Sequence, residues 1–83
     1  MEVRIEAEIL PIKNGVLARG INTGLAANGA TNDLALRSLE RTLTYWCRGL
    51  EREGTLEEAL HRRGIAWERT GSDLSVETLA ARR

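Results

Sequence analysis

The order of its periodic segments constrains the fold of this chain more than any single residue does. Residues 2–9 alternate strictly between charged and apolar side chains, and two glycine-bordered strand candidates follow at 16–21 and 25–27. Such alternation is typical of a strand with one face on a core and one face in water. From Asn32 to Glu53 the apolar spacing changes to that of a helix. This order predicts an α+β domain with a three-stranded antiparallel sheet, a long helix packed on one face, and a fourth strand at 65–68.

The first strand is expected to have two distinct faces. Its apolar face should contact the core and consists of Val3, Ile5, Ala7 and Ile9. Its charged face should contact water and consists of Glu2, Arg4, Glu6 and Glu8. Pro11 is expected to end the strand, because proline donates no hydrogen bond to a central ladder. Asn14 and Gly15 tolerate the positive φ of tight turns, so the next strand should return beside the first.

Capping residues and glycines mark the ends of two predicted helices. Thr31 is the expected N-cap of the long helix. Gly54 is expected to end this helix, because the position after the last helical residue favours left-handed backbone geometry, which glycine adopts readily. The apolar side of this helix should cover the sheet and contains Leu36, Leu39, Leu43, Trp46 and Leu50. The run Thr55-Leu56-Glu57-Glu58 has the capping-box pattern. It predicts a short second helix that ends at Gly64.

Composition limits how so small a chain can be stabilised. The chain has 83 residues, with Cys47 as its only cysteine and His61 as its only histidine. An intramolecular disulfide is therefore excluded, and a metal cluster built on these residue types is not expected. Self-association is the remaining way to bury more surface, so we expect a homodimer or a higher even-numbered oligomer. The charges in residues 2–8 and the lack of a long apolar run argue against an export signal or a membrane span, and favour a cytoplasmic protein.

The outward side of the long helix is the candidate partner-binding surface. Four arginines and a tyrosine are expected there: Arg37, Arg41, Tyr45, Arg48 and Arg52. Arginine forms bidentate contacts with carboxylates and phosphates, and an exposed tyrosine can anchor an interface. The functional interpretation is a docking surface for an acidic partner or for RNA phosphates. The alternative is a solvated helix face, since acidic residues bring this helix to zero net charge.

Support for a catalytic site is weaker. Glu6 and Glu8 point the same way from the first strand, roughly 7 Å apart by strand geometry. A hydrolytic metal site needs a further ligand converging on them, and Asp33 is expected on the other side of the sheet. No glycine pattern for phosphate binding forms either. We therefore expect no enzyme activity, cofactor or metal, with a minimal metal-dependent nuclease as the alternative.

The segment from Asn28 to Leu39 resembles the HicB-like antitoxin family. Its matching residues are Gly29, Thr31, Asp33, Ala35, Leu36 and Leu39. The run at 54–60, followed by Gly64-Ile65, also looks like family members with a second short helix. The resemblance covers residues 3–69 and implies a partial RNase H-like α+β unit. We accordingly expect one domain over residues 1–69 and a C-terminal tail over residues 70–83.

The same resemblance implies a function. It implies a non-enzymatic module that neutralises a small mRNA-cleaving toxin by covering its RNA-binding and catalytic surface. The residues after Arg69 are too few for the DNA-binding domain of many family members, so no direct DNA binding is expected. Within the tail, Ser75 is a candidate cap for one helical turn through Leu79, with a mobile segment as the alternative. An orphan scaffold that only self-associates remains the alternative function.

Overall fold

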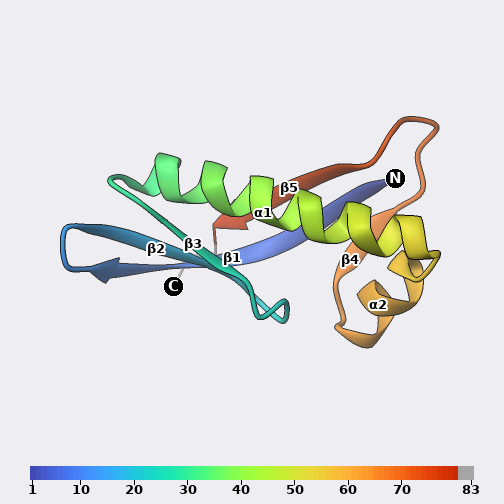
Figure 1. Ribbon diagram of the computed structural model, residues 1–83, viewed down its shortest axis with the longest axis horizontal. Coiled ribbons are helices and arrows are strands. Elements are labelled where there is room, and N and C mark those ends of the chain that lie inside the picture. Colours follow the sequence, from blue (N-terminus) through green and yellow to red (C-terminus); the bar gives the residue numbers. More distant parts are fainter. Residues whose placement is uncertain (81–83) are drawn as a thin grey trace.

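The long first strand, β1 (Glu2–Ile12), is the centre of the sheet (Figure 1). The computed structural model describes residues 1–80. β2 (Gly15–Gly20) pairs antiparallel with the second half of β1, and β3 (Ala26–Gly29) pairs antiparallel with β2. The predicted three-stranded meander is thus confirmed. β4 (Ala66–Glu68) pairs antiparallel with the start of β1, which confirms the fourth strand.

A fifth strand, β5 (Ser75–Ala80), corrects the prediction for the C-terminal tail. β5 pairs parallel with residues 2–7 of β1, so this segment is part of the sheet and forms no helical turn. Ala7 pairs with Gly20 of β2 and also with Ala80, which places β2 and β5 on opposite edges of β1. The second edge of β1 carries backbone groups that need hydrogen-bond partners, and β5 supplies them. The last part of the predicted tail, residues 81–83, lies outside the described residues.

Pro11 does not end β1, contrary to expectation, and pairs with Val16 of β2. The backbone of Ile21 donates to the carbonyl of Glu6 at 2.8 Å, so the backbone groups of even-numbered β1 residues point toward β2. The backbone groups of Pro11 point toward the opposite edge of β1. Because β5 ends opposite Ala7, no strand of residues 1–80 lies beside Pro11 on that edge, so no strand needs the hydrogen bond that proline cannot donate.

Two helices follow the meander, at the predicted positions. α1 (Asn32–Glu53) begins after Thr31, whose Oγ1 accepts a hydrogen bond from the Leu34 N–H at 3.2 Å. Gly54 ends it with φ 74°. α2 (Leu56–Arg62) begins without the predicted cap, because the Thr55 side chain makes no N-terminal hydrogen bond there. The Thr55 N–H instead donates to the Leu50 carbonyl at 2.9 Å, so this residue completes the end of α1.

α1 covers one face of the sheet, as predicted (Figure 1). Its fully buried row is spaced by four residues and consists of Ala35, Leu39, Leu43 and Cys47. The predicted stripe is therefore only partly correct, since Leu36, Trp46 and Leu50 are half-buried at the border of the core. The sheet meets this row with Val3, Ile5, Ala7 and Ala18, all buried. Small residues in the row allow the helix to approach the sheet closely.

Candidate partner-binding surface

The outward side of α1 carries the arginine stripe, which we define as Arg37, Arg41, Arg48 and Arg52. They share one side because helical residues three, four and seven positions apart are neighbours on the surface. All four side chains are exposed, as predicted. Tyr45 is also exposed, with 71% of its surface open to solvent. The predicted candidate residues therefore lie together on the side of α1 opposite the buried row.

The arginines of the stripe differ from the other arginines in their contacts. Four arginines outside the stripe form ion pairs with glutamates, with N–O distances of 2.7–2.9 Å: Arg4, Arg19, Arg62 and Arg69. The guanidinium of Arg63 lies over the Trp46 ring, 5.1 Å from its centroid. It also donates to the Asn22 carbonyl at 3.1 Å. Within residues 1–80, no ion pair, hydrogen bond or ring contact engages a side chain of the stripe.

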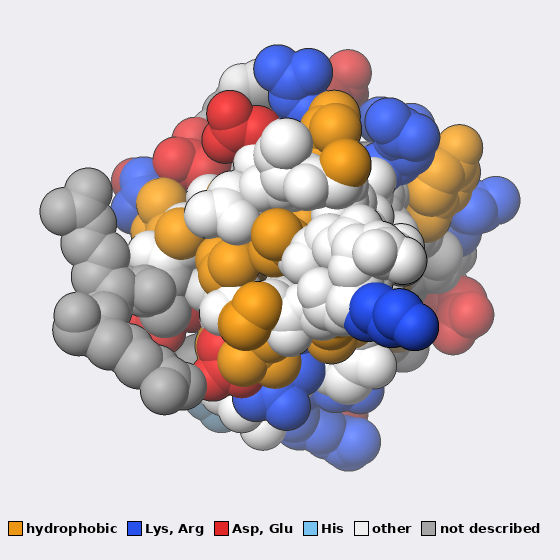
Figure 2. Space-filling view, turned by 90° about the vertical axis from the view of Figure 1, so that its left-hand side faces the viewer, with side chains coloured by type: hydrophobic (Ala, Val, Ile, Leu, Met, Phe, Trp, Pro, Cys, Tyr) orange, Lys and Arg blue, Asp and Glu red, His pale blue; other side chains and the backbone are white. Residues whose placement is uncertain are grey.

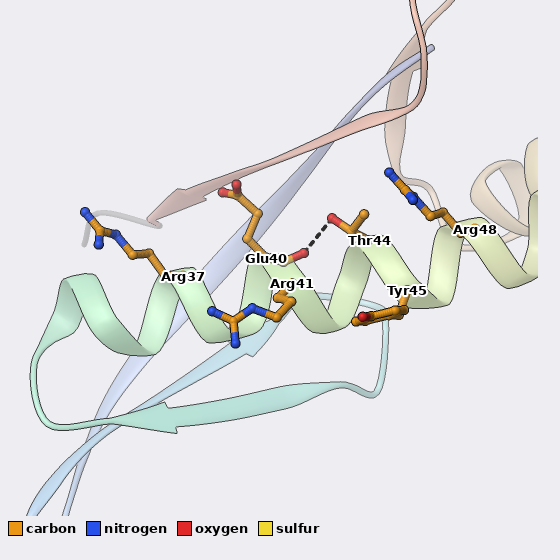
Figure 3. Close-up of a pocket in the computed structure, with 6 residues that line it drawn as sticks. All are labelled: Arg37, Glu40, Arg41, Thr44, Tyr45 and Arg48. Atoms are coloured by element: carbon orange, nitrogen blue, oxygen red, sulfur yellow. Dashed lines mark hydrogen bonds between the residues drawn. The ribbon is translucent and has the colours of Figure 1, made fainter.

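A shallow hollow runs along the first part of the stripe (Figure 3). It is lined by side chains of α1 alone: Arg37, Glu40, Arg41, Thr44, Tyr45 and Arg48. Figure 3 shows Glu40 on the flank of the helix toward β5, and Arg41 and Tyr45 on the opposite flank. The Glu40 carboxylate accepts a hydrogen bond from Thr78 Oγ1 of β5 at 3.4 Å. Because one helix supplies every wall, this hollow suits the surface of a partner better than an enclosed small molecule.

A second hollow continues the stripe toward the segment that precedes β5. Arg48 and Arg52 line it from α1, together with Tyr45. Glu51 and Asp73 line it as well and bring two carboxylates to the same place. The amino terminus of Met1 lines it too, so the second hollow has one net positive charge, against two in the first hollow, which three arginines and Glu40 line.

The carboxylates proposed for a nuclease lie on the open face of the sheet. Glu8 forms an ion pair with Arg19 across the β1–β2 ladder, at 2.7 Å. Arg4 bridges Glu2 at 2.8 Å and Glu68 at 3.6 Å, and the hydrogen bond and charge of Glu2 raise the pKa of Arg4. Among residues 1–80 no group of three or more His, Cys, Asp or Glu side chains is arranged to hold a metal ion. The structure thus brings no third ligand to Glu6 and Glu8.

Cys47 and His61 lie in different environments. Cys47 is fully buried in the core, and its burial, with a smaller contribution from Glu51, raises the pKa of the thiol to about 11. A thiol in this state is a poor nucleophile. His61 is exposed near the end of α2.

Two large apolar side chains are exposed at the end of the molecule that contains the β1–β2 hairpin. Ile12 is 41% exposed and Leu34 is 48% exposed. Figure 2 looks onto this end and shows hydrophobic side chains interspersed with basic and acidic ones. Single exposed apolar residues of this kind are common on soluble domains. The exposure of Ile12 and Leu34 therefore does not indicate a binding site.

Comparison with known proteins gives no relative. The chain matches no protein-family model, no curated protein and no solved structure. Within the part of the chain that the structure describes, no helix is long and apolar enough to cross a membrane.

The sequence reasoning missed Glu40 as a member of the first hollow, whereas Thr44 fills the gap between the arginines, as its spacing predicts. The spacing of Glu40 from Arg37 and Arg41 places it on the same side of α1, so the helical period was the signal that could have found it. It also missed the second hollow, which combines α1 with residues 72–74. No local pattern could have found that hollow, because the contact depends on where β5 joins the sheet.

Proposed function

We propose that this chain is a non-enzymatic protein-binding module of the HicB-like antitoxin kind. It neutralises a small mRNA-cleaving toxin by covering the toxin surface that binds and cleaves RNA. The module is cytoplasmic, assembles as a homodimer or a higher even-numbered oligomer, and makes no direct contact with DNA. The toxin as partner follows from the family resemblance of residues 3–69.

One observation supports partner binding more than any other. Every arginine of residues 1–80 outside the stripe makes an ion pair, hydrogen bond or ring contact within the chain, whereas the side chains of the stripe make no contact of these three kinds. Guanidinium groups left without internal partners are available for bidentate contacts with carboxylates of another molecule. Tyr45 adds a large exposed ring at the same place. We assign partner binding to Arg37, Arg41, Tyr45, Arg48 and Arg52.

Capture of the partner from the native host is the first test. The tagged chain is used for the pull-down, mass spectrometry identifies the captured protein, and light scattering gives the mass of the complex. We expect a stoichiometric partner of toxin size. By itself this partner should cleave mRNA, and the cleavage should stop when an equimolar amount of the chain is added. A partner whose RNA cleavage continues in the complex would contradict neutralisation.

Substitutions in the stripe test the surface. The double variant Arg37→Ala/Arg41→Ala should weaken partner binding by about tenfold or more, because each lost charged contact contributes roughly 1 kcal/mol or more. The matched control Lys13→Ala/Arg62→Ala removes the same charge away from the stripe and should leave the affinity within about twofold. Equal losses in both variants would show that net charge, and not the stripe, governs binding.

The nuclease remains the enzyme alternative and has its own test. Glu8 is already engaged by Arg19, which weighs against a metal at this pair of carboxylates. Calorimetric titration of wild type and Glu6→Ala with Mg²⁺ and Mn²⁺ separates the two functions. Binding that disappears in Glu6→Ala would support the nuclease. If no partner and no metal binds, the orphan scaffold becomes the better explanation.

A further inference from the structure

β5 is an unprotected edge strand. Its six residues, Ser75–Ala80, pair with β1 along one edge, and within residues 1–80 no strand pairs with the other edge. Proteins usually guard such edges with charged side chains, above all lysine, with proline or with a bulge. β5 has no proline or lysine and Glu77 is its one charged residue, and its register with β1 is continuous from Ser75 to Ala80. Leu79 is 44% exposed on the open face of the sheet beside this edge.

The direction of each backbone group in β5 follows from one hydrogen bond. The Ser75 N–H donates to the Met1 carbonyl at 2.9 Å, so the backbone groups of Ser75 point toward β1. Because this direction alternates along a strand, Val76, Thr78 and Ala80 point their N–H and C=O groups away from the sheet. These are the groups that a further strand would pair with.

The opposite edge of the sheet offers less. β3 has four residues, and Ala27 and Gly29 face β2 in the ladder. Only Ala26 and Asn28 then present outward groups. Gly29 also lies directly against the start of α1, where a Cβ would meet Ala35 N at 2.5 Å. β5 is therefore longer than the other two strands that have an open edge, β3 and the three-residue β4.

We propose that β5 pairs antiparallel with β5 of a second copy of this chain, so that two sheets join into one continuous sheet. A strand edge is self-complementary under two-fold symmetry, since each N–H can meet a C=O of the same element in the other copy. This inference deepens the self-association in the proposed function and requires no toxin partner. A monomeric wild type would overturn it while leaving partner binding by the arginine stripe intact.

The register of the pair can be derived from β5 itself. A two-fold axis at Thr78 places Thr78 opposite its own copy and Val76 opposite Ala80, so every outward backbone group finds a partner. An axis at Glu77 would instead set two Glu77 carboxylates directly opposite each other, which is unfavourable. With the axis at Thr78, Glu77 lies opposite Leu79 of the second copy, and the exposed part of Leu79 is covered by the aliphatic part of the glutamate.

The flanks of the two α1 helices also meet near this axis. Glu40 lies 3.4 Å from Thr78 Oγ1, so the pairing brings the two Glu40 carboxylates to the same side of the joined sheet. Each Glu40 carboxylate keeps the hydrogen bond from Thr78 of its own copy, so the pairing does not need a residue of the arginine stripe.

A proline in β5 tests the pairing without disturbing the fold. Thr78→Pro removes an outward N–H and adds a ring at the edge, while the hydrogen bonds of β5 to β1 remain. The control Thr78→Ala loses the contact with Glu40 but keeps the N–H. By light scattering, wild type and Thr78→Ala should show about twice the 9.2 kDa of one chain. Thr78→Pro should raise the dimer dissociation constant at least about tenfold.

Hydrogen exchange and cross-linking complete the test. The amides of Val76 and Ala80 should exchange slowly in wild type and quickly in Thr78→Pro, whose circular dichroism should match that of Thr78→Ala. Oxidation should link Thr78→Cys into dimers but not Glu77→Cys, because only position 78 meets its own copy within disulfide range. A monomeric wild type, a Thr78→Pro dimer of undiminished affinity, or cross-linking only at position 77 would each overturn the proposed interface.

Discussion

At the scale of single residues, Gly29 shows how little space separates the sheet from α1. A Cβ on Gly29 would lie 2.5 Å from Ala35 N and 2.8 Å from Leu34 C, and both are backbone atoms that cannot turn away. Gly29→Ala should therefore lower the free energy of unfolding by roughly 1–3 kcal/mol, as overpacking of a tight contact does. Urea denaturation followed by circular dichroism measures the change.

Gly49 is the matched control for that substitution. It lies within α1, and a Cβ there would meet nothing within 4 Å. Gly49→Ala should raise the free energy of unfolding by about 0.5–1 kcal/mol, because alanine loses less conformational freedom in a helix. A stabilised or unchanged Gly29→Ala would show that β3 and α1 do not approach as closely as described.

Cys47 makes the stability of the protein depend on pH in the alkaline range. Burial raises the pKa of its thiol from 9.0 to about 11, so between these values the folded chain keeps a proton that the unfolded chain releases. The stabilisation is complete below pH 9 and is lost as the pH rises to 11, by about 2–3 kcal/mol. Urea midpoints measured from pH 8 to 11 should fall more steeply for wild type than for Cys47→Ala. Parallel slopes would contradict the raised pKa.

At the scale of elements, β1 has one face that tolerates charge and one that does not. Val3 is fully buried under α1, whereas Glu6 lies exposed on the open face. Val3→Asp should unfold the domain, because an unpaired carboxylate in the core costs several kcal/mol. Glu6→Gln should change the free energy of unfolding by less than about 0.5 kcal/mol. Thermal melts of both variants are the measurement, and equal damage would mean that the faces are reversed.

At the scale of the whole molecule, β5 connects the end of the chain to its beginning. It pairs with β1 from residue 2 to residue 7, and its Val76 is buried in the core. A chain that ends at Arg69 should be largely unfolded at room temperature, since a domain of this size has only a few kcal/mol to lose. A chain that ends at Ala80 is the control and should fold. A cooperative melt of the shorter chain would show that β5 is dispensable.

The elements could be predicted where neighbouring residues determine them. The alternation in β1, the Thr31 cap and Gly54 predicted the first strand and both ends of α1, and the structure confirms each of them. β5 could not be predicted in this way. Val76 and Thr78 face the helix side while Glu77 and Leu79 face outward, so polar and apolar residues do not alternate cleanly. Its strand conformation depends on the free edge of β1, which is distant in the sequence.

The sequence by itself determined the α+β class, the order of the elements as far as β4 and the exposure of the arginine stripe. Hydrophobic period, capping and turn residues are local properties, and they act before the chain is packed. Only the tertiary structure decided that β5 lies parallel to β1, that Ala35 and Cys47 belong to the buried row, and that no ion pair, hydrogen bond or ring contact within residues 1–80 engages the stripe. These features depend on which distant segments meet, and packing and backbone hydrogen bonding across the whole domain select them.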